Sequence, residues 1–449
     1  MKIALISEHA SPLAVAGGVD SGGQNIYVAH LAREFVKAGH KVDVFTRRDK
    51  ALLPDIVDFH GARVVHVPAG PPVQMPKESL LQYMDAFSAF VVKFASAEVV
   101  GYDVVHANFF MSGIAGMALQ RALGVPLAVT FHALGKVRRL HQGANDGFPD
   151  ARFEIEETLV RRADLIVAEC PQDESDLITY YNADPTRLVT VPCGFDRTEM
   201  RQINRSLAKR TLNWRADEFA VLQLGRLVER KGIDTVIRAL SRLTGAARQK
   251  ARLYIVGGNS DAPNELATPE IGRLRRVALD EGVASSVTFV GRRGRDQLQW
   301  YYSAADAFVT TPWYEPFGIT AIEAMACGTP TIGARVGGIQ HSIVDGETGW
   351  LVPPKDPDAL AARLMWLYEH PKAAAKAGQA GVARAYSTFT WQGVAEAMAN
   401  AFQSIQRDGA EDGYSAIQMR ATDESAEVHA VQGRSVAAES KVGNRALAG

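Results

Sequence analysis

Two glutamates eight residues apart, Glu315 and Glu323, frame the run EPFGITAIE in this sequence. The proline after Glu315 cannot sit in a helix interior, so we expect that glutamate in a loop. A glycine then leads into a helix whose first N–H groups would be available to a phosphate. The residues at this helix start are Gly318, Ile319 and Thr320. The two carboxylates could accept hydrogen bonds from sugar and ribose hydroxyls.

A second segment carries two cations. Arg226 and Lys231 follow the expected strand Phe219–Gly225, at the end of a strand where a diphosphate could sit. Such cations would neutralise the negative charge that develops on a departing diphosphate. The alternative is a solvated, charged loop, which an isolated Arg and Lys more often indicate.

A glycine-rich run, GGVDSGGQN at residues 17–25, follows the first expected strand and opens a helix. Gly22 and Gly23 would let the backbone approach an anionic ligand closely. The run lacks the spaced Gly-x-Gly-x-x-Gly pattern of dinucleotide sites, and a flexible turn is the alternative. His9 and His132 also follow strands, so each is either a structural residue or part of a cleft.

Short apolar runs alternate with amphipathic ones along the first half, which is typical of a doubly wound parallel sheet. The expected strands there are Lys2–Ser7, Lys41–Arg47, Ala62–Pro68, Asp103–Asn108, Pro126–Phe131, Leu165–Cys170 and Leu188–Pro192. The expected helices between them include Asn25–Ala38, Lys77–Val100 and Phe153–Arg162.

The second half repeats this scheme. Its expected strands are Phe219–Gly225, Leu253–Gly258, Val287–Gly291, Ala307–Thr311 and Thr329–Ala334. Its expected helices include Gly232–Leu243, Ile271–Glu281, Arg295–Ala304, Ile319–Ala326 and Pro357–Glu369. We therefore predict two Rossmann-like α/β domains, residues 1–195 and 196–388, that face a central cleft. An amphipathic helix over 389–407 and a disordered polar tail over 408–449 complete the prediction.

Composition narrows the class of protein. The net charge is −1, which argues against an electrostatic nucleic-acid binder. The three cysteines lack metal-ligand spacing and fit a reducing compartment as small buried residues. The sequence shows neither a signal peptide nor an apolar stretch of about 18 residues, so we expect a cytoplasmic protein without a transmembrane segment.

Taken together, residues 2–407 resemble the family 4 retaining glycosyltransferases of the GT-B fold. The nearest likenesses are the sucrose-phosphate synthase and sucrose synthase group and the inositol-phosphate N-acetylglucosaminyltransferase of mycothiol synthesis. Residues 20–24, DSGGQ, look like the glycine loop of the first group, and residues 9–13, HASPL, look like the start of the second.

The resemblance implies a donor side. Arg226 and Lys231 match the diphosphate-binding pair, and Glu323 matches the ribose carboxylate. Glu315 matches the acid that contacts the donor sugar, and His132 matches the histidine beside the anomeric centre. Further donor contacts are implied for Gly22, Gly23, Arg292, Gly318, Ile319 and Thr320.

The residues that bind the acceptor in the resembled family match this sequence less well than the donor residues do. Acceptor contacts are expected from His9, Asp20, Gln24, Asn25, Lys77, Lys136 and Arg152. In the inositol-phosphate enzymes a Lys, a Tyr, a Thr and an Arg hold the acceptor phosphate. Lys77 and Arg152 match the two cations, but Phe109 and Ala133 replace the two hydroxyl donors. The resemblance therefore argues against inositol phosphate and leaves another phosphorylated or anionic sugar open.

The function that the resemblance implies is transfer of a hexosyl group, with retention, from a nucleotide-diphosphate sugar to a small carbohydrate. A UDP-sugar is favoured as donor. The leaving phosphate would help take the acceptor proton, so no cofactor is required; a divalent metal could assist without being essential. Self-association stays open. The alternatives are a sugar-nucleotide epimerase or hydrolase on the same fold, and a catalytically silent nucleotide-sugar binder.

Overall fold

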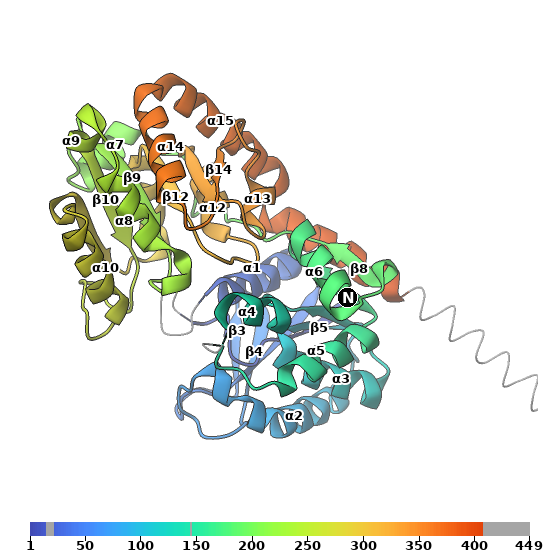
Figure 1. Cartoon of the computed structure of the whole chain (residues 1–449). Helices are drawn as coiled ribbons and strands as arrows, with labels where there is room; N and C mark the ends of the chain where they lie inside the picture. Colours follow the sequence, from blue (N-terminus) through green and yellow to red (C-terminus); the bar gives the residue numbers. More distant parts are fainter. Residues whose placement is uncertain (15–21, 144–145, 407–449) are drawn as a thin grey trace, which may run out of the picture.

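The chain forms two lobes, each built around one open sheet with helices on both faces (Figure 1). The computed structural model describes residues 1–14, 22–143 and 146–406. In spatial order the first sheet contains β3 (Ile56–Phe59), β4 (Ala62–Val67), β2 (Lys41–Arg47), β1 (Lys2–Ile6), β5 (Val104–Asn108), β6 (Leu127–Thr130), β7 (Leu165–Ala168) and β8 (Leu188–Thr190).

The second sheet lies in the C-terminal lobe. In spatial order it contains β11 (Val287–Gly291), β10 (Ala251–Val256), β9 (Phe219–Leu224), β12 (Ala307–Thr310), β13 (Thr331–Ala334) and β14 (Trp350–Val352). All its pairings are parallel, which confirms the predicted fold class of two Rossmann-like domains.

Helices cover both sheets, as buried parallel strands require. The N-terminal lobe uses α1 (Gly23–Lys37), α2 (Met84–Ser96), α3 (Phe110–Leu123), α4 (Gly135–Gln142), α5 (Ala151–Arg162) and α6 (Pro171–Tyr181). The C-terminal lobe uses α7 (Arg205–Thr211), α8 (Ile233–Ser241), α9 (Gly245–Lys250), α10 (Pro269–Asp280), α11 (Arg295–Ala304), α12 (Ile319–Ala326), α13 (Ile339–Ser342), α14 (Pro357–Glu369) and α15 (Pro371–Thr388).

Three local elements differ from the sequence prediction. Strand β14, a three-residue strand at the edge of the second sheet, is not among the expected strands. Strand β3 pairs antiparallel with β4 at the sheet edge, and its partly exposed residues lack the apolar pattern of a buried strand. The helix expected over Lys77–Val100 begins only at Met84, because two short 3₁₀ turns precede it. In those turns the N–H of Leu80 bonds Lys77 and that of Tyr83 bonds Leu80.

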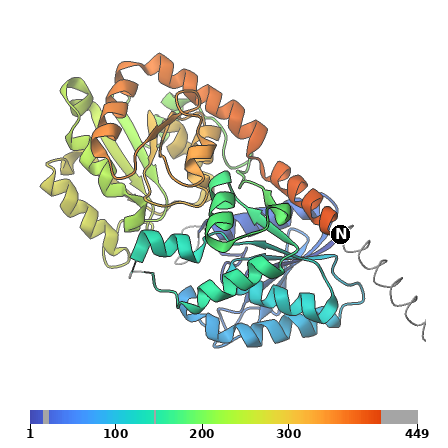
Figure 2. The same ribbon diagram turned by 45° about the vertical axis from the view of Figure 1, so that its right-hand side comes forward.

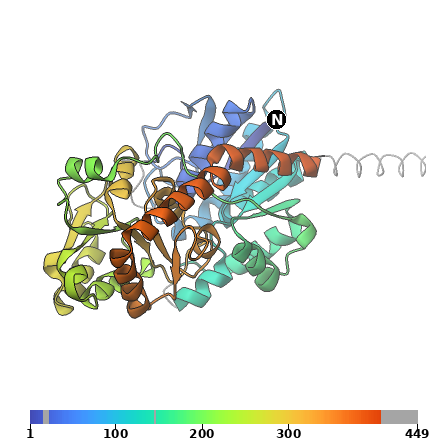
Figure 3. The same cartoon turned by 90° about the horizontal axis from the view of Figure 1, so that it is seen from above.

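Two segments connect the lobes side by side. Phe195 forms a parallel bridge with Thr390, and its N–H donates to the carbonyl of Phe389 at 2.8 Å. After this crossing, residues 391–406 form a helix that runs along the N-terminal lobe, drawn in red in Figures 2 and 3. There Trp391 packs against Tyr27, and Phe402 packs against Phe35. The predicted tail 408–449 lies outside the described residues.

The strand order of each sheet reverses direction at one point. In the first sheet β1 lies between β2 and β5, and in the second β9 lies between β10 and β12. Ligands of such sheets bind beyond the carboxyl ends of the strands at these switch points. Both switch points face the space between the lobes. Among the described helices, none is long and apolar enough to span a bilayer.

Candidate active site

A cavity of about 420 Å³ lies between the lobes. Loops at the carboxyl ends of β1, β5, β6, β9, β10 and β12 contribute to its walls, as the switch points require. Most sequence-predicted site residues meet there, namely His9, Gly22, Gly23, Gln24, Asn25, Lys77, His132, Arg226, Lys231, Arg292, Glu315, Gly318, Ile319, Thr320 and Glu323. Asp20 lies outside the described residues.

Two helix starts face each other across this cavity. A Cβ added to Gly23 at the start of α1 would lie 3.7 Å from Ile319 at the start of α12. A Cβ added to Gly22 would lie 3.9 Å from Nη1 of Arg226. Because helix N-termini carry free N–H groups and partial positive charge, the two helix starts and Arg226 together make a candidate anion site.

Gly318 makes the second helix start possible. Its φ of 94° lies in the left-handed region that favours glycine, and it is the N-cap residue of α12. A Cβ there would also lie only 2.7 Å from Cγ1 of Ile339. The glycine of the EPFGI run is therefore required by backbone geometry and by packing.

Glu315 is held by two cations. Its carboxylate accepts hydrogen bonds from Nζ of Lys231 and from Nη1 of Arg230, the latter at 3.4 Å. Burial opposes ionisation, but the charges of Lys231 and Arg230 outweigh it and hold the pKa of Glu315 below its usual value. Burial also lowers the pKa of Lys231, which Glu315 opposes. The loop acid is therefore charged, and it lines the same cavity as both cations.

Glu323 lies on α12 and is almost fully buried, with an exposed fraction of 2%. Oε1 accepts from Nη2 of Arg295 at 2.9 Å, and Oε2 accepts from the hydroxyl of Tyr302 at 2.9 Å. Each carboxylate oxygen can accept a further hydrogen bond from a ligand hydroxyl.

His132 lies two residues after the end of strand β6 and lines the cavity from the N-terminal lobe. Nδ1 lies 3.0 Å from Oε1 of Glu169, and Nε2 lies 3.0 Å from Oδ1 of Asn108. Burial opposes ionisation of Glu169, but His132 and hydrogen bonds from His132 and Cys193 outweigh it, so the pKa of Glu169 lies below its usual value. The imidazole is thus fixed in orientation beside a charged carboxylate.

His132 and Phe109 share an uncommon backbone. Their φ values are 57° and 90°, in the left-handed region, and both follow neighbouring strands at the cavity wall. Non-glycine residues in this region cost on the order of 1–3 kcal/mol each, and such strain concentrates at functional sites. The strain supports a functional role for this edge of the first sheet.

His9, Gln24 and Asn25 use their side chains mostly for bonds to neighbouring loops of the cavity wall. Nδ1 of His9 lies 2.6 Å from Glu8, and its ring packs edge-on against Phe109. Nε2 of Gln24 donates to the carbonyl of Asn108 at 3.0 Å. The amide of Asn25 bonds the backbone of Ser11 and Gly22.

Two predicted acceptor residues do not line the cavity. Nζ of Lys136 donates instead to Glu157 at 2.6 Å and to the carbonyl of Tyr180 at 2.7 Å. Arg152 is fully buried, and its guanidinium pairs with Glu156 and the carbonyl of Ala133. Direct contact of either side chain with an acceptor would require a rearrangement of these pairs.

Phe109 separates Arg152 from the cavity. The guanidinium lies 5.0 Å from the centre of the Phe109 ring and 4.9 Å from that of Phe110. Such a cation gains electrostatic attraction from ring faces when it is removed from water. Arg152 therefore stabilises the wall from behind.

Arg292 lines the cavity from the C-terminal lobe. Its backbone N–H donates to the carbonyl of Ser260 at 2.8 Å, and its guanidinium pairs with Asp261. Its carbonyl accepts from Arg293. Any backbone contact with a nucleotide base would share or replace these bonds.

Sequence reasoning missed several residues that hold the predicted ones. Asn108 and Glu169 orient His132, Arg230 pairs with Glu315, and Arg295 pairs with Glu323. Asn108 ends an expected strand and Glu169 lies near the end of another, which is the one signal that could have found them. The cysteines are buried thiols, and Cys193 lines the cavity.

Family models match both lobes. Residues 21–199 match the model described as Glycosyltransferase Family 4, and residues 204–384 match that described as Glycosyl transferases group 1. A D-inositol 3-phosphate glycosyltransferase 2 of Catenulispora acidiphila is 35% identical over 413 residues, 91% of this chain and 96% of the relative. The chain belongs to glycosyltransferase family 4.

Further comparisons agree with this family. A D-inositol 3-phosphate glycosyltransferase of Corynebacterium diphtheriae is 34% identical over 408 residues, 90% of this chain and 94% of the relative. The sucrose-phosphate synthase structure from Thermosynechococcus elongatus matches at a TM-score of 0.82 and 33% identity, covering 90% of this chain and 98% of that one. This glycosyltransferase therefore has the GT-B fold, and it is a retaining hexosyltransferase that uses a nucleotide sugar.

Proposed function

We propose that this glycosyltransferase moves a hexosyl group from a UDP-sugar to a phosphorylated or otherwise anionic sugar. The observation that carries the proposal is the anion site formed by the starts of α1 and α12 with Arg226, next to Lys231. Its positive charge suits the departing diphosphate. Glu315 would contact the donor sugar, Glu323 the ribose and Arg292 the base.

A phosphorylated acceptor is supported by the names of the relatives, which concern inositol 3-phosphate and sucrose phosphate. Lys77 and Arg138 line the N-terminal wall. Arg138 also pairs with Asp146 at 2.8 Å, so an anionic acceptor would share its guanidinium with that carboxylate. Inositol phosphate itself is disfavoured, because Phe109 and Ala133 offer no hydroxyl and Arg152 is turned onto Glu156. His9, Gln24 and Asn25 would shape this acceptor wall.

In this mechanism the protein supplies position and charge. His132, fixed by Glu169 and Asn108, would lie beside the anomeric centre. Arg226 and Lys231 would stabilise charge on the leaving diphosphate, whose oxygen takes the acceptor proton on the same face. Because these cations already neutralise the diphosphate, we infer that a divalent metal is not essential. Turnover that persists in EDTA would support this, and abolished turnover would contradict it.

The test is a donor-by-acceptor screen with the product anomer assigned by NMR. UDP-, GDP- and ADP-glucose would each be combined with hexose phosphates, neutral hexoses and D-inositol 3-phosphate. We expect transfer with retention from UDP-glucose to a hexose phosphate. Donor cleavage that ignores every acceptor would favour a hydrolase or epimerase, and binding without cleavage would favour a silent binder.

The domain boundaries at residues 195 and 388, the cytoplasmic location and self-association stay predictions. Limited proteolysis would locate the boundaries, and light scattering would give the oligomeric state.

A further inference from the structure

The ribose-side carboxylate Glu323 is held from one face of the preceding helix. Arg295 and Tyr302 lie seven residues apart on α11, which is two helical turns, so both side chains point the same way. Both donate to Glu323 at 2.9 Å, one to each oxygen. The orientation of this carboxylate therefore depends on Arg295.

Arg295 also contacts the segment that crosses between the lobes. Its Nε donates to Oε2 of Glu199 at 2.6 Å, so one guanidinium bridges two carboxylates. Glu199 belongs to the segment that crosses between the lobes, four residues after the bridge of Phe195 to Thr390. Its N–H bonds the carbonyl of Asp196 in a turn. The hinge and the donor site thus share one side chain.

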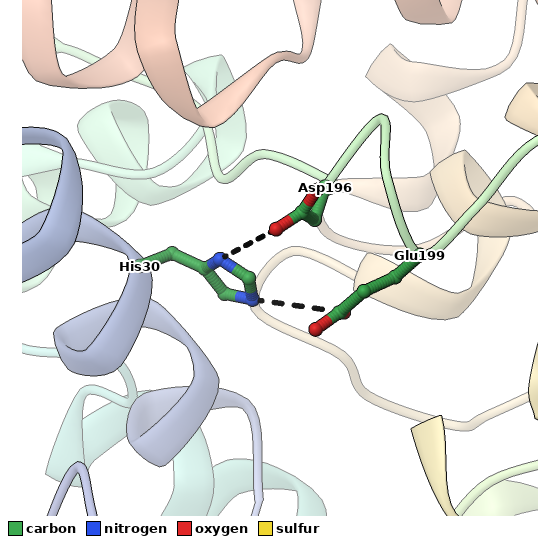
Figure 4. A group of neighbouring side chains, drawn as sticks. All are labelled: His30, Asp196 and Glu199. Atoms are coloured by element: carbon green, nitrogen blue, oxygen red, sulfur yellow. Dashed lines mark ion pairs between the residues drawn. The ribbon is translucent and has the colours of Figure 1, made fainter. Parts of the chain in front are cut away.

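His30 brings the N-terminal lobe to the same point. It projects from α1 between Asp196 and Glu199, with Nδ1 3.6 Å from the first carboxylate and Nε2 3.9 Å from the second (Figure 4). The flat face of the ring stacks on the ring of Trp391, with 5.2 Å between the ring centres. Trp391 comes just after the second crossing segment. Both crossing segments therefore contact one residue of α1.

Helix α1 connects this point to the cavity. His30 lies seven residues after Gly23, hence two turns along the same face, and Gly23 faces Ile319 at the anion site. A rotation of the N-terminal lobe would move the start of α1 and the hinge cluster together.

The cluster of His30, Asp196 and Glu199 could in principle hold a metal ion. Both carboxylates, however, already have cationic partners, because Arg33 pairs with Asp196 and Arg295 pairs with Glu199. Burial and the charges of Arg295 and Arg33 lower the pKa of His30 to about 3, so its ring is neutral. The arrangement is therefore an ion-pair network between the lobes.

We propose that Arg295 is a positioning residue that couples the ribose carboxylate Glu323 to the interdomain hinge through Glu199. When the lobes close, Glu199 moves with the crossing segment, and Arg295 transmits that movement to Glu323. Donor binding and closure would then favour each other. This inference rests on the proposed donor function of Glu323.

Glu199→Gln tests the coupling at a residue outside the cavity. With a neutral partner at the hinge, Arg295 would pair with Glu323 alone and draw that carboxylate away from the ribose. We expect the Kd of UDP to rise about three- to tenfold by calorimetry, with an unchanged Tm. UDP-induced compaction, measured as the radius of gyration by X-ray scattering, should shrink. Arg205→Lys, which alters the separate pair with Asp306, is the control and should change neither the Kd of UDP nor the compaction.

A double-mutant cycle separates this role from a merely structural one. Glu199 and Glu323 connect through Arg295, so the effects of Glu199→Gln and Glu323→Gln on the Kd of UDP should be non-additive. In an Arg295→Met background that non-additivity should vanish, whereas Arg295→Lys should restore part of the donor affinity. With the transfer assay, Glu199→Gln should raise the KM for the donor more than it lowers kcat.

The outcomes distinguish the two proposals. Additive effects, or a Glu199→Gln variant whose Kd and compaction equal those of the wild type, would overturn the coupling while leaving the donor site intact. A wild-type protein that binds none of UDP, GDP and ADP would overturn the donor proposal and the coupling with it.

Discussion

His132 combines a left-handed backbone with contacts to both ring nitrogens. This strain is maintained at the cavity wall rather than in the core, which favours a chemical role. Asn is the informative replacement, because it tolerates the left-handed region better than Ala.

We therefore predict that His132→Asn lowers kcat about 10²-fold while Tm stays within a few degrees. A positioned side chain near the reacting centre contributes about 10²–10⁴-fold to a rate. Steady-state kinetics and a thermal melt check this. Near-normal turnover in the folded variant would assign His132 a structural role only.

Asp173, near the start of α6, gives a prediction about pH. Burial and the nearby charge of Glu169 raise the pKa of Asp173 to about 7. The folded protein therefore keeps a proton that the unfolded chain has released above about pH 4. This contribution to stability is fully present below about pH 4 and is lost as the pH rises to about 7.

Asp173→Asn should remove the loss of folding stability that occurs as the pH rises to about 7. Its amide oxygen can still accept the N–H of Glu169, which the carboxylate accepts at 3.0 Å. We expect the Tm of the variant relative to wild type to be higher at pH 8 than at pH 4.5, by a few degrees, since the side chain keeps some exposure that screens the effect. A difference in Tm that does not change with pH would contradict the titration of Asp173.

At the scale of elements, α4 shows that cations close in sequence can point to different surroundings. Arg138 and Gln142 lie one turn apart and line the cavity, whereas Lys136 points to Glu157 on α5. The sequence places Lys136, Arg138 and Arg139 together, but the period of the helix sends them to different surroundings.

Arg138→Ala and Lys136→Ala form a matched pair on this helix. If an anionic acceptor binds beside α4, a folded Arg138→Ala variant should show an acceptor KM raised about tenfold and an unchanged donor KM, because a hydrogen bond to a charged group is lost. Lys136→Ala should change neither KM. A thermal melt checks the fold of the Arg138→Ala variant, since Arg138 also pairs with the buried Asp146 at 2.8 Å. Equal effects of the two variants would remove α4 from acceptor recognition.

At the scale of the whole molecule, the two crossing segments determine how the lobes meet. Gly194 lies against the second crossing: a Cβ there would lie 2.7 Å from the backbone nitrogen of Trp391. A Cβ added to Gly101 would meet nothing within 4 Å, so that glycine serves as a control.

Gly194→Ala should therefore separate the crossing segments. Overpacking of this kind costs about 1–3 kcal/mol, which lowers the Tm of a domain of this size by several degrees. UDP-induced compaction in X-ray scattering should also change. Gly101→Ala should leave both measurements as in the wild type, and equal melts for the two variants would refute the role of this contact.

The sequence by itself determined the fold class, because apolar runs covered on both faces require parallel strands and helices. It also placed Glu315, Gly318 and Glu323 in one loop and helix start, because the local geometry of that segment follows from residue types. Their roles toward the donor stay a prediction. The sequence did not predict the edge strands β3 and β14 or the late start of α2. Strand β3 is partly exposed and β14 has only three residues, so neither shows a strong apolar period.

Only the tertiary structure decided the partners of these residues. Arg295 lies 28 residues before Glu323 and 96 after Glu199, and no local period relates the three. The tertiary structure likewise shows that Lys136 and Arg152 do not line the cavity, whereas Arg138 does. The physical reason is that helix phase and interlobe packing determine side-chain direction, whereas residue type and spacing determine only which element a residue occupies.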